Sequence, residues 1–312
     1  MNRDVRGLIE NYYDINVSSS EAITKKAVKL VNEDGTPYFF KRTSYNAPQK
    51  YQFLASLGIS NILFPILNKN NQYVTQNKYE NFYLSNFVND YTLVAEVKAV
   101  NMVNELQKLH EKTSFSRQLS PRTARPKFEE LTAQLDYKFK LIEEFVRSVE
   151  SKPLGVYSMP ILSNYHHILD AKTELARLQK RLISRIKEKE SVDYTFVHNN
   201  PKLDHLLNVR GARYLTSIEN GKVGISSLDL AKFYLENEDL NIDMNSIIQK
   251  YFGKYDNDFY LDYFRYLVLF MSIKRIVVTD LDYISAQNFI NSATSLKRYF
   301  DQFSITKKKV SE

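Results

Sequence analysis

The sequence predicts an α+β protein in which a small antiparallel sheet and a larger set of helices occupy separate parts of the chain. Residues 1–88 hold short apolar and aromatic runs separated by turns, a pattern typical of strands. From residue 89 onward, apolar residues recur mainly at helical spacing. Because 312 residues are many for one compact core, we expect two lobes, a β-rich N-lobe over 1–88 and a mainly helical C-lobe over 89–312.

The N-lobe is predicted to be a five-stranded sheet with one helix. Its clearest element is a hairpin over residues 27–42, in which two apolar runs flank an Asp-Gly turn. A short helix is expected over 47–57, because Gly58 after it suits a left-handed C-cap. Two further strands are expected near 72–75 and 82–85, which contain aromatic and other apolar residues.

The C-lobe is predicted from stripes of apolar residues that repeat every three or four positions. Helices are expected over 94–109, 131–149, 175–186 and much of 228–303. Short strands are expected at 194–197 and 213–218, and the polar, proline-containing segment 114–125 is expected to be a loop. This order of elements indicates segregated lobes, but it does not identify a function.

Composition excludes several kinds of site and partner. The chain has no cysteine, which excludes disulfides, thiolate metal sites and cysteine nucleophiles. The net charge of +7 and the pI of about 9.1 would suit an anionic partner. The densest basic segment, 180–189, also contains acids and is predicted to be a solvated helix face. No nucleic-acid-binding motif occurs, so we do not expect a nucleic-acid partner.

Neither a signal peptide nor a membrane span is expected. Residues 1–5 lack the apolar core of a signal peptide. The longest apolar run, 266–271, is far shorter than the ~20 residues that a membrane helix requires. We therefore expect a cytoplasmic protein in which 266–271 belongs to a buried helix.

Three short motifs occur along the chain. Residues 106–110 read LQKLH, residues 197–207 read VHNNPKLDHLL, and residues 228–231 read LDLA. The second resembles the catalytic loop of aminoglycoside phosphotransferases and choline kinases, V-x-H-G-D-x-x-x-x-N-I/L-L, and the others resemble the L-x-x-L-H and Y-D-L-A motifs of that superfamily. Residues 152–186 also resemble its spore-coat-associated branch. The resemblance implies a bilobal protein-kinase-like fold with a catalytic-loop-like segment at 196–219, and phosphotransferase chemistry with ATP and Mg²⁺.

The resemblance also suggests which residues would hold a nucleotide. Lys41 ends an apolar strand after the hairpin, where the family has the lysine that holds ATP phosphate; a lysine that only faces water is the equal alternative. Ser18 and Ser19 stand where the family chain turns over the nucleotide, and their backbone could cradle an anion without a glycine-rich loop. The helix glutamate that would pair Lys41 is missing, with Gln52 or no residue in its place.

The catalytic-loop and LDLA motifs, with the spacing between them, imply a role for each of five positions. His198 is expected to organise the loop through buried hydrogen bonds. Asn200 stands at the position of the catalytic base, and His205 at that of a metal-binding asparagine. Ser217, 17 residues after Asn200 and 12 before Asp229, stands at the position of the metal-binding aspartate. Asp229 is expected to brace the loop structurally.

These substitutions remove the groups that phosphoryl transfer needs. A neutral amide at position 200 is a poor proton acceptor, and a general base contributes ~10²–10⁴-fold to a rate. Mg²⁺ prefers hard oxygen ligands, so the imidazole of His205 and the hydroxyl of Ser217 are weak replacements. Asp204 and Glu219 are the carboxylates near enough to rescue metal binding. On an extended segment Glu219 would share the side of Ser217, although a solvent-facing acid is the simpler interpretation.

We therefore expect a pseudokinase of this superfamily, a binding or scaffold protein with weak or absent nucleotide binding that acts through a protein partner. This hypothesis predicts that ATP and Mg²⁺ bind weakly or not at all. The alternative is an active ATP-dependent phosphotransferase on a small hydroxyl- or amine-bearing substrate, with a metal site rebuilt on Glu219 or Asp204. A third hypothesis, a basic nucleic-acid-binding protein, would require strong binding that survives high salt.

Overall fold

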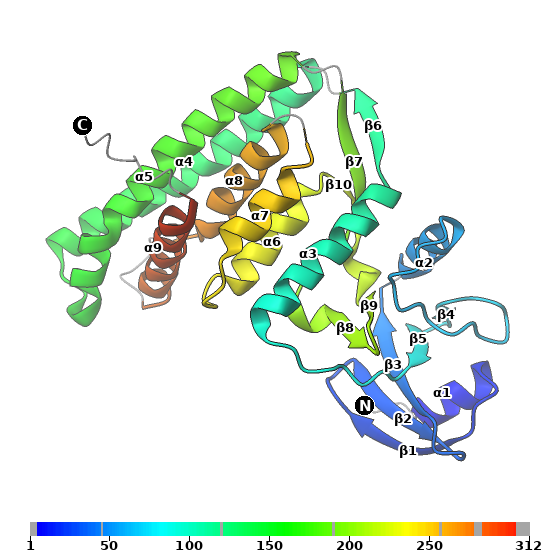
Figure 1. Ribbon diagram of the computed structural model, residues 1–312. Coiled ribbons are helices and arrows are strands. Elements are labelled where there is room, and N and C mark those ends of the chain that lie inside the picture. The colour runs from blue at the N-terminus through cyan, green and yellow to red at the C-terminus, as the bar shows by residue number, and fades with distance from the viewer. Residues whose placement is uncertain are drawn as a thin grey trace. The chain divides into compact units, whose positions relative to one another are not determined.

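The computed structural model of the chain describes residues 5–44, 46–118, 121–188, 191–255, 258–277 and 283–303. The chain divides into two compact units. Unit 1 consists of residues 1–113 and 196–223, and unit 2 of residues 114–195 and 224–312. Unit 1 holds an antiparallel sheet near the N-terminus, whereas unit 2 is dominated by long helices (Figure 1). The predicted α+β organisation, a small β lobe followed by a mainly helical part, is confirmed.

The sheet of unit 1 has five strands, as predicted. They are β1 (Val17–Ala22), β2 (Ala27–Asn32), β3 (Pro37–Thr43), β4 (Thr75–Gln76) and β5 (Asn81–Asn86). Their order in the antiparallel sheet is β1-β2-β3-β5-β4, so the predicted hairpin is the pair β2 and β3, with Gly35 at φ 85° in its turn. Helix α2 (Ala47–Ser56) also forms where expected, and Gly58 adopts φ 61° after it.

A helix that the sequence analysis missed completes the core of this sheet. Helix α1 (Val5–Tyr12) packs its buried Ile9 into one cluster with Leu30 of β2, Phe40 of β3 and Phe82 of β5. Burying one such side chain contributes about 1.5–3 kcal/mol. Because Phe40 is anchored on this side, its neighbour Lys41 points to the opposite face of the sheet.

The remaining elements of unit 1 come after the sheet along the chain. It consists of α3 (Ala95–Lys112), the short helices η2 (Leu203–His205) and η3 (Ile218–Asn220), and a hairpin of β8 (Leu206–Val209) and β9 (Ala212–Leu215). The β9 strand packs against α3. Its Leu215 donates its N–H to the Asn61 carbonyl at 2.8 Å and accepts from the Leu63 N–H at 3.0 Å. These bonds attach the catalytic-loop-like segment to the sheet lobe.

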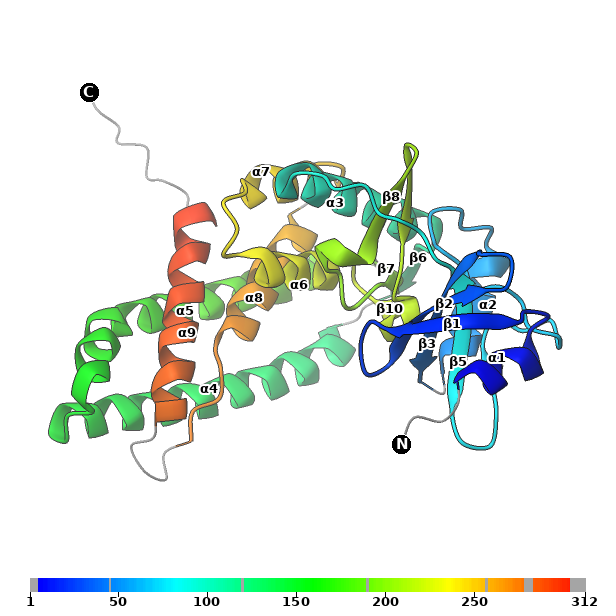
Figure 2. The same ribbon diagram turned by 90° about the horizontal axis from the view of Figure 1, so that it is seen from below.

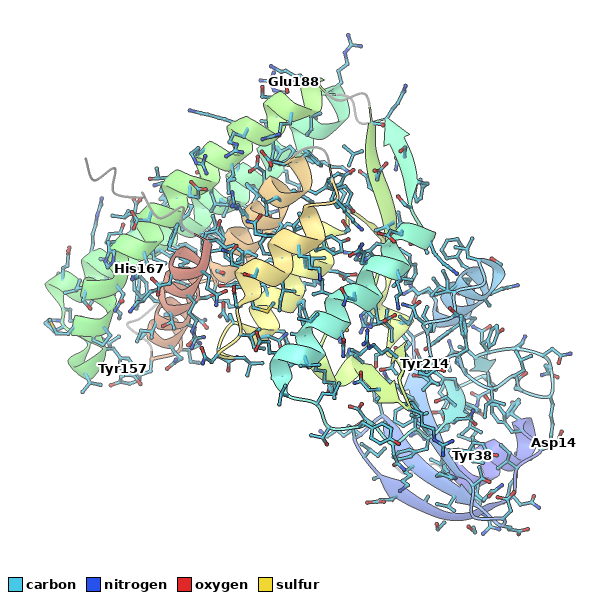
Figure 3. All side chains as sticks on the ribbon, in the orientation of Figure 1. Asp14, Tyr38, Tyr157, His167, Glu188 and Tyr214 are labelled. Carbon is cyan, nitrogen blue, oxygen red and sulfur yellow. The ribbon has the colours of Figure 1, made fainter. Side chains whose placement is uncertain are left out.

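Unit 2 is built on two long helices that lie side by side and run in opposite directions (Figures 1 and 2). Its elements are β6 (Phe115–Gln118), α4 (Pro121–Ser151), η1 (Gly155–Tyr157), α5 (Ser158–Glu188), α6 (Ser227–Asn237), α7 (Met244–Phe252), α8 (Phe259–Ser272) and α9 (Tyr283–Phe303), while β7 (Ser191–Val197) and β10 (Lys222–Gly224) lie at the borders of the units. Helix α5, on which Figure 3 labels His167 and Glu188, packs against α4, α8 and α9. Asp262 of α8 is fully buried and ion-paired with Arg181 of α5 at 3.0 Å.

One predicted loop in unit 2 is a different structure. Residues 114–125 were expected to be irregular, but they contain strand β6 and the start of α4. The strand forms because β7 offers it an antiparallel partner, with Phe115 opposite Tyr194. Such long-range pairing cannot be detected in a short polar segment. Among the helices of the described residues, none combines the length and apolar character needed to cross a membrane.

Candidate functional site

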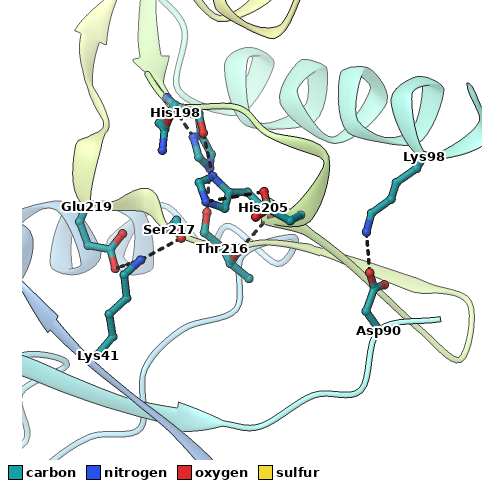
Figure 4. Close-up of polar contacts among 10 residues, drawn as sticks. Lys41, Asp90, Lys98, His198, His205, Thr216, Ser217 and Glu219 are labelled. Atoms are coloured by element: carbon teal, nitrogen blue, oxygen red, sulfur yellow. Dashed lines mark hydrogen bonds and ion pairs between the residues drawn. The ribbon is translucent and has the colours of Figure 1, made fainter. Parts of the chain in front are cut away.

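Lys41 lies at the centre of a polar cluster in unit 1. Its ammonium Nζ donates to the Ser217 hydroxyl at 2.9 Å and lies 3.3 Å from Glu219 Oε1 (Figure 4). The Lys41 side chain is 23% exposed and the Glu219 side chain 7% exposed, so this ion pair is largely withdrawn from water. The Lys41 side chain therefore points to this cluster rather than to open solvent.

A tight turn, not an extended strand, brings Ser217 and Glu219 to the same ammonium. Ser217 adopts the left-handed conformation, at φ 58° and ψ 38°, and helix η3 begins directly after it. The expected alternation along a strand is therefore wrong for this segment, although the two side chains do converge. Gly221 ends the turn beside the Phe196 ring. A Cβ at position 221 would lie 2.2 Å from that ring, so this close approach requires glycine.

Glu219 has an unusual buried environment that the sequence analysis did not anticipate. Lys50 of α2 donates its ammonium to the Glu219 backbone carbonyl. Burial raises the pKa of the Tyr51 and Tyr83 hydroxyls, and the negative charge of Glu219 raises both further. Lys41 supplies the close opposite charge to the Glu219 carboxylate, and the Tyr83 hydroxyl is a second polar neighbour.

The charges on helix α2 and on the loop are the opposite of those that the family resemblance implies. Where the family resemblance led us to look for a helix glutamate near Gln52, helix α2 instead places Lys50 against the loop that carries Glu219. The carboxylate partner of Lys41 comes from the loop. No local pattern in residues 48–54 indicates this exchange, because it depends on the conformation of Ser217.

His198 is fully buried and fixes the catalytic-loop-like segment. Its Nδ1 accepts from the Asn200 N–H at 3.3 Å, so the proton of the neutral ring is on Nε2, which donates to the Thr216 carbonyl at 2.7 Å. Asn199 between them adopts φ 64°, at the position where the resembling motif has glycine. Asparagine tolerates this left-handed conformation better than most residues.

His205 makes a second contact with the same loop. Its Nδ1 donates to the Asn200 carbonyl at 2.8 Å, and its ring stacks on that of His198 with the centroids 5.6 Å apart. Burial lowers the pKa of His205, and the nearby Lys41 charge lowers it further, whereas the Asn200 bond and Asp204 oppose the shift. The neutral ring is thus favoured. Two histidines therefore hold the backbone of Asn200.

A cavity of about 350 Å³ adjoins this cluster. Its apolar wall includes Ile23, Ala27, Phe39, Leu63 and Leu207, and its polar end includes Lys41, Asp204, His205, Thr216 and Ser217. All of these residues belong to unit 1. The cavity can therefore surround an apolar or aromatic group and present an ammonium to an anionic one.

The turn beside this cavity is not where the sequence suggested. Ser18 and Ser19 lie within β1, and the Ser18 hydroxyl donates to the β2 carbonyls of Val31 at 2.9 Å and Asn32 at 2.8 Å. The connection between β1 and β2 is residues 23–26, of which Ile23 lines the cavity. Serine suits a bulged strand as well as a turn, so composition alone could not separate the two positions.

The remaining predicted residues do not build a magnesium site. Asp204 is 80% exposed and lies 4.0 Å from His205 Nε2, while Glu219 already faces the Lys41 ammonium. Across the described residues, no three acidic or histidine side chains gather as metal ligands would. A hydroxyl, an imidazole and a paired carboxylate do not fit the oxygen-rich octahedral shell of Mg²⁺. Asp229 is fully buried in unit 2, at the first turn of α6.

Comparison with solved structures shows which proteins share this fold. The chain is similar to a spectinomycin phosphotransferase solved with ADP and spectinomycin, at a TM-score of 0.58 and 14% identity over 96% of this chain and 100% of that one. The same enzyme solved with AMP gives a TM-score of 0.55 at 15% identity, with coverage of 95% and 94%.

Two further enzymes agree. An aminoglycoside phosphotransferase from Alicyclobacillus acidocaldarius gives a TM-score of 0.54 at 11% identity, covering 97% of this chain and 93% of that one. A microcompartment-associated aminopropanol kinase gives 0.52 at 13% identity, with coverage of 95% and 97%. No family model matches the chain, and no curated protein matches it. At these identities the likeness shows the fold alone, and the predicted bilobal kinase-like fold is confirmed.

Proposed function

We propose that this chain, which has the fold of the aminoglycoside phosphotransferases, binds a nucleotide-sized anionic ligand without the metal-dependent phosphoryl transfer of those enzymes. In this proposal it is a pseudokinase, and ligand binding serves a scaffold or regulatory role toward a protein partner in the cytoplasm. Adenine nucleotides are the first candidates, because ADP and AMP are bound by the spectinomycin phosphotransferase of the same fold.

The observation that carries the proposal is the position of the Lys41 ammonium. It contacts both Ser217 and Glu219, the two side chains on which a metal site would have to be built. A divalent cation placed among these atoms would meet a positive charge at close range, and the repulsion is strong where water is excluded. The lysine thus supplies the positive charge that a metal ion supplies in an active kinase.

The catalytic-loop-like segment supports the same conclusion. Asn200 holds the base position, and its amide cannot take a proton from a substrate hydroxyl at a useful rate. Its backbone is nevertheless held by His198 and His205. A loop that keeps its bonded conformation while lacking its base fits a binding role better than catalysis.

An active phosphotransferase is the second candidate, and one observation favours it. Both carboxylate oxygens of Glu219 are buried, with the Lys41 ammonium and the Tyr83 hydroxyl as their close polar neighbours. A buried acceptor of this kind would gain from a further positive ligand. In this alternative Lys41 moves away from Glu219 when a metal nucleotide binds, and the substrate is a small hydroxyl- or amine-bearing molecule.

Melting the full chain with ATP, ADP and AMP in the presence of EDTA tests the proposal. A ligand at ~100 times its Kd stabilises the folded state by ~2.7 kcal/mol, so binding raises Tm measurably. We expect a rise with at least one nucleotide that Lys41→Met abolishes. Lys78→Gln is the matched charge control, because Lys78 is exposed in the β4–β5 loop and does not line the cavity.

Two results would overturn it. No shift with any nucleotide, with or without Mg²⁺, would remove nucleotides as ligands and leave a protein partner as the binding function to test. Turnover of ATP that requires Mg²⁺ and is lost in Glu219→Gln would establish the second candidate instead.

A further inference from the structure

A second hollow in unit 1 lies apart from the Lys41 cavity. It is a groove of about 460 Å³ between the linker that follows β5, helix α3 and the β8–β9 hairpin. The residues that matter for its chemistry are Tyr91, Leu93, Val97, Asn101, Arg210 and Arg213. None of them lines the Lys41 cavity. The groove is therefore distinct from the Lys41 cavity.

The wall between the two hollows is the strand β8. Leu207 lines the cavity and Asn208 lines the groove, because successive residues of a strand face opposite sides. Asn208 is fixed by Asp90, whose Oδ1 accepts from the Asn208 N–H at 2.8 Å and from its Nδ2 at 3.2 Å. Lys98 pairs with the other oxygen of Asp90 (Figure 4). The groove wall is thus preorganised, and its nearby acid is neutralised.

The groove carries positive charge that internal acids do not fully balance. Arg210 and Arg213 line it, and no acidic side chain does. The Arg213 guanidinium lies 3.8 Å from Glu105 Oε1, but the same oxygen accepts from Lys108 at 2.7 Å, and Asn61 occupies Glu105 Oε2 at 3.0 Å. Glu105 is therefore shared among three donors. Arg213 keeps donors for an anion in the groove.

A buried amide in the groove lacks a partner. Asn101 of α3 is 7% exposed, lines the groove, and makes no side-chain hydrogen bond within the part of the chain that the structure describes. A ligand oxygen placed between Asn101 and the two arginines would satisfy this amide. The lack of a hydrogen bond to this amide is an observation independent of the arginines, and it also indicates a ligand.

The other side of the groove is apolar and aromatic. Tyr91 is 56% exposed and Val97 is 45% exposed, with Leu93 beside them. An exposed tyrosine ring is a stacking surface for a planar group, and the apolar residues would bury the rest of it. The groove volume is within the range of about 300–1,000 Å³ that small-molecule sites occupy.

We propose that this groove binds a small organic anion, a carboxylate or a phosphate monoester attached to an aromatic or apolar group. The anionic oxygens bind Arg210, Arg213 and the Asn101 amide, and the planar group lies on Tyr91 and Val97. This site is separate from the proposed nucleotide cavity, and it does not depend on whether that cavity binds a nucleotide.

Phenyl phosphate is the probe, and a nuclear magnetic resonance titration of the ¹⁵N-labelled full chain is the measurement. The titration is run in the Lys41→Met background as well as in the native chain, so that binding at the Lys41 cavity is identified separately. We expect saturable shifts of the Asn101 side-chain amide, the Gly211 N–H and the Arg213 Nε–H in both. Phenol, which lacks the anion, should bind at least about tenfold more weakly, because charge-assisted hydrogen bonds are lost.

Two variants make the result decisive. Arg210→Asn removes the guanidinium, and asparagine tolerates the backbone angle of φ 47° at this position. This variant should weaken phenyl phosphate binding about tenfold. Asn101→Asp keeps the side-chain size and should abolish binding through like-charge repulsion; its amide spectrum reports whether the fold is kept. Lys78→Gln, which alters charge in the same unit outside both hollows, should leave the Kd unchanged. Absent shifts, or an affinity that Arg210→Asn and Lys78→Gln alter equally, would overturn the proposal.

Discussion

The ammonium of Lys41 lies 3.3 Å from the carboxylate of Glu219, and this pair joins strand β3 to the turn after β9. The pair is therefore a structural link within unit 1, and its lysine lines the polar end of the cavity.

Separating the pair should reveal an energetic coupling between the two residues. Lys41→Met leaves a buried carboxylate without its opposite charge and should cost about 1–3 kcal/mol of unfolding free energy. Glu219→Gln should cost less, and the double variant should cost less than the sum by about 1 kcal/mol. Urea denaturation of the four proteins measures this cycle. Strictly additive effects would mean that the ion pair contributes nothing to stability.

The left-handed backbone conformation of Asn199 should affect the thermal stability of variants at this position. Alanine at φ 64° carries a steric cost of about 1–2 kcal/mol, whereas glycine adopts this conformation freely. Both substitutions remove the bond from the Asn199 amide to the Asn220 carbonyl, so the difference between them isolates the backbone term. Thermal melts should therefore show Asn199→Ala to be less stable than Asn199→Gly. Equal melting temperatures would contradict the assigned conformation.

Gly221 should not tolerate a larger side chain. An added Cβ would lie 2.2 Å from the Phe196 ring, which is buried and cannot easily move, so Gly221→Ala should lose about 1–3 kcal/mol. Phe196→Leu opens space at the same point and should reduce the additional cost of Gly221→Ala. Denaturation of the single and double variants compares the two costs. If the alanine cost is the same beside leucine, the close approach is not its cause.

Acid should destabilise the loop through His205. Burial lowers the pKa of His205 in the folded protein below the value of 6.5 that an unperturbed histidine has. The unfolded state then binds more protons, so the stabilising contribution is complete above pH 6.5 and is lost as the pH falls through the folded pKa. His205→Asn should flatten the dependence of Tm on pH in that window. Burial also lowers the pKa of His167, which is unchanged in this variant and cancels in the comparison. An unchanged profile would argue against a buried neutral His205.

Much of the fold could be predicted because its signals are local. The β2–β3 hairpin has an Asp-Gly turn between apolar runs, and α5 has a regular apolar stripe. Lys41 was found because it follows an apolar run after the hairpin, where the resembling family has its phosphate-binding lysine. These features depend on residues close in sequence, where period and turn chemistry are decisive.

The details of the site could not be predicted in the same way. The roles of Lys50 and Tyr83 around Glu219 depend on the αL turn at Ser217, which brings together segments distant in sequence. The position of the β1–β2 turn depended on where the Ser18 hydroxyl bonds in β2. A non-glycine residue at positive φ and a bulged strand have no reliable signature in a single sequence.

The direction in which Mg²⁺ changes the Kd for ATP tests the central claim most directly. Titration calorimetry in EDTA and in saturating Mg²⁺ gives both values, with AMP, a much weaker Mg²⁺ ligand than ATP, as the control nucleotide. If Lys41 takes the place of the metal, Mg²⁺ should weaken ATP binding or leave it unchanged, since Mg²⁺ neutralises the phosphates that the ammonium attracts. Mg²⁺ should leave AMP binding unaffected. Binding of ATP that Mg²⁺ strengthens, and that Glu219→Gln makes insensitive to Mg²⁺, would contradict the account.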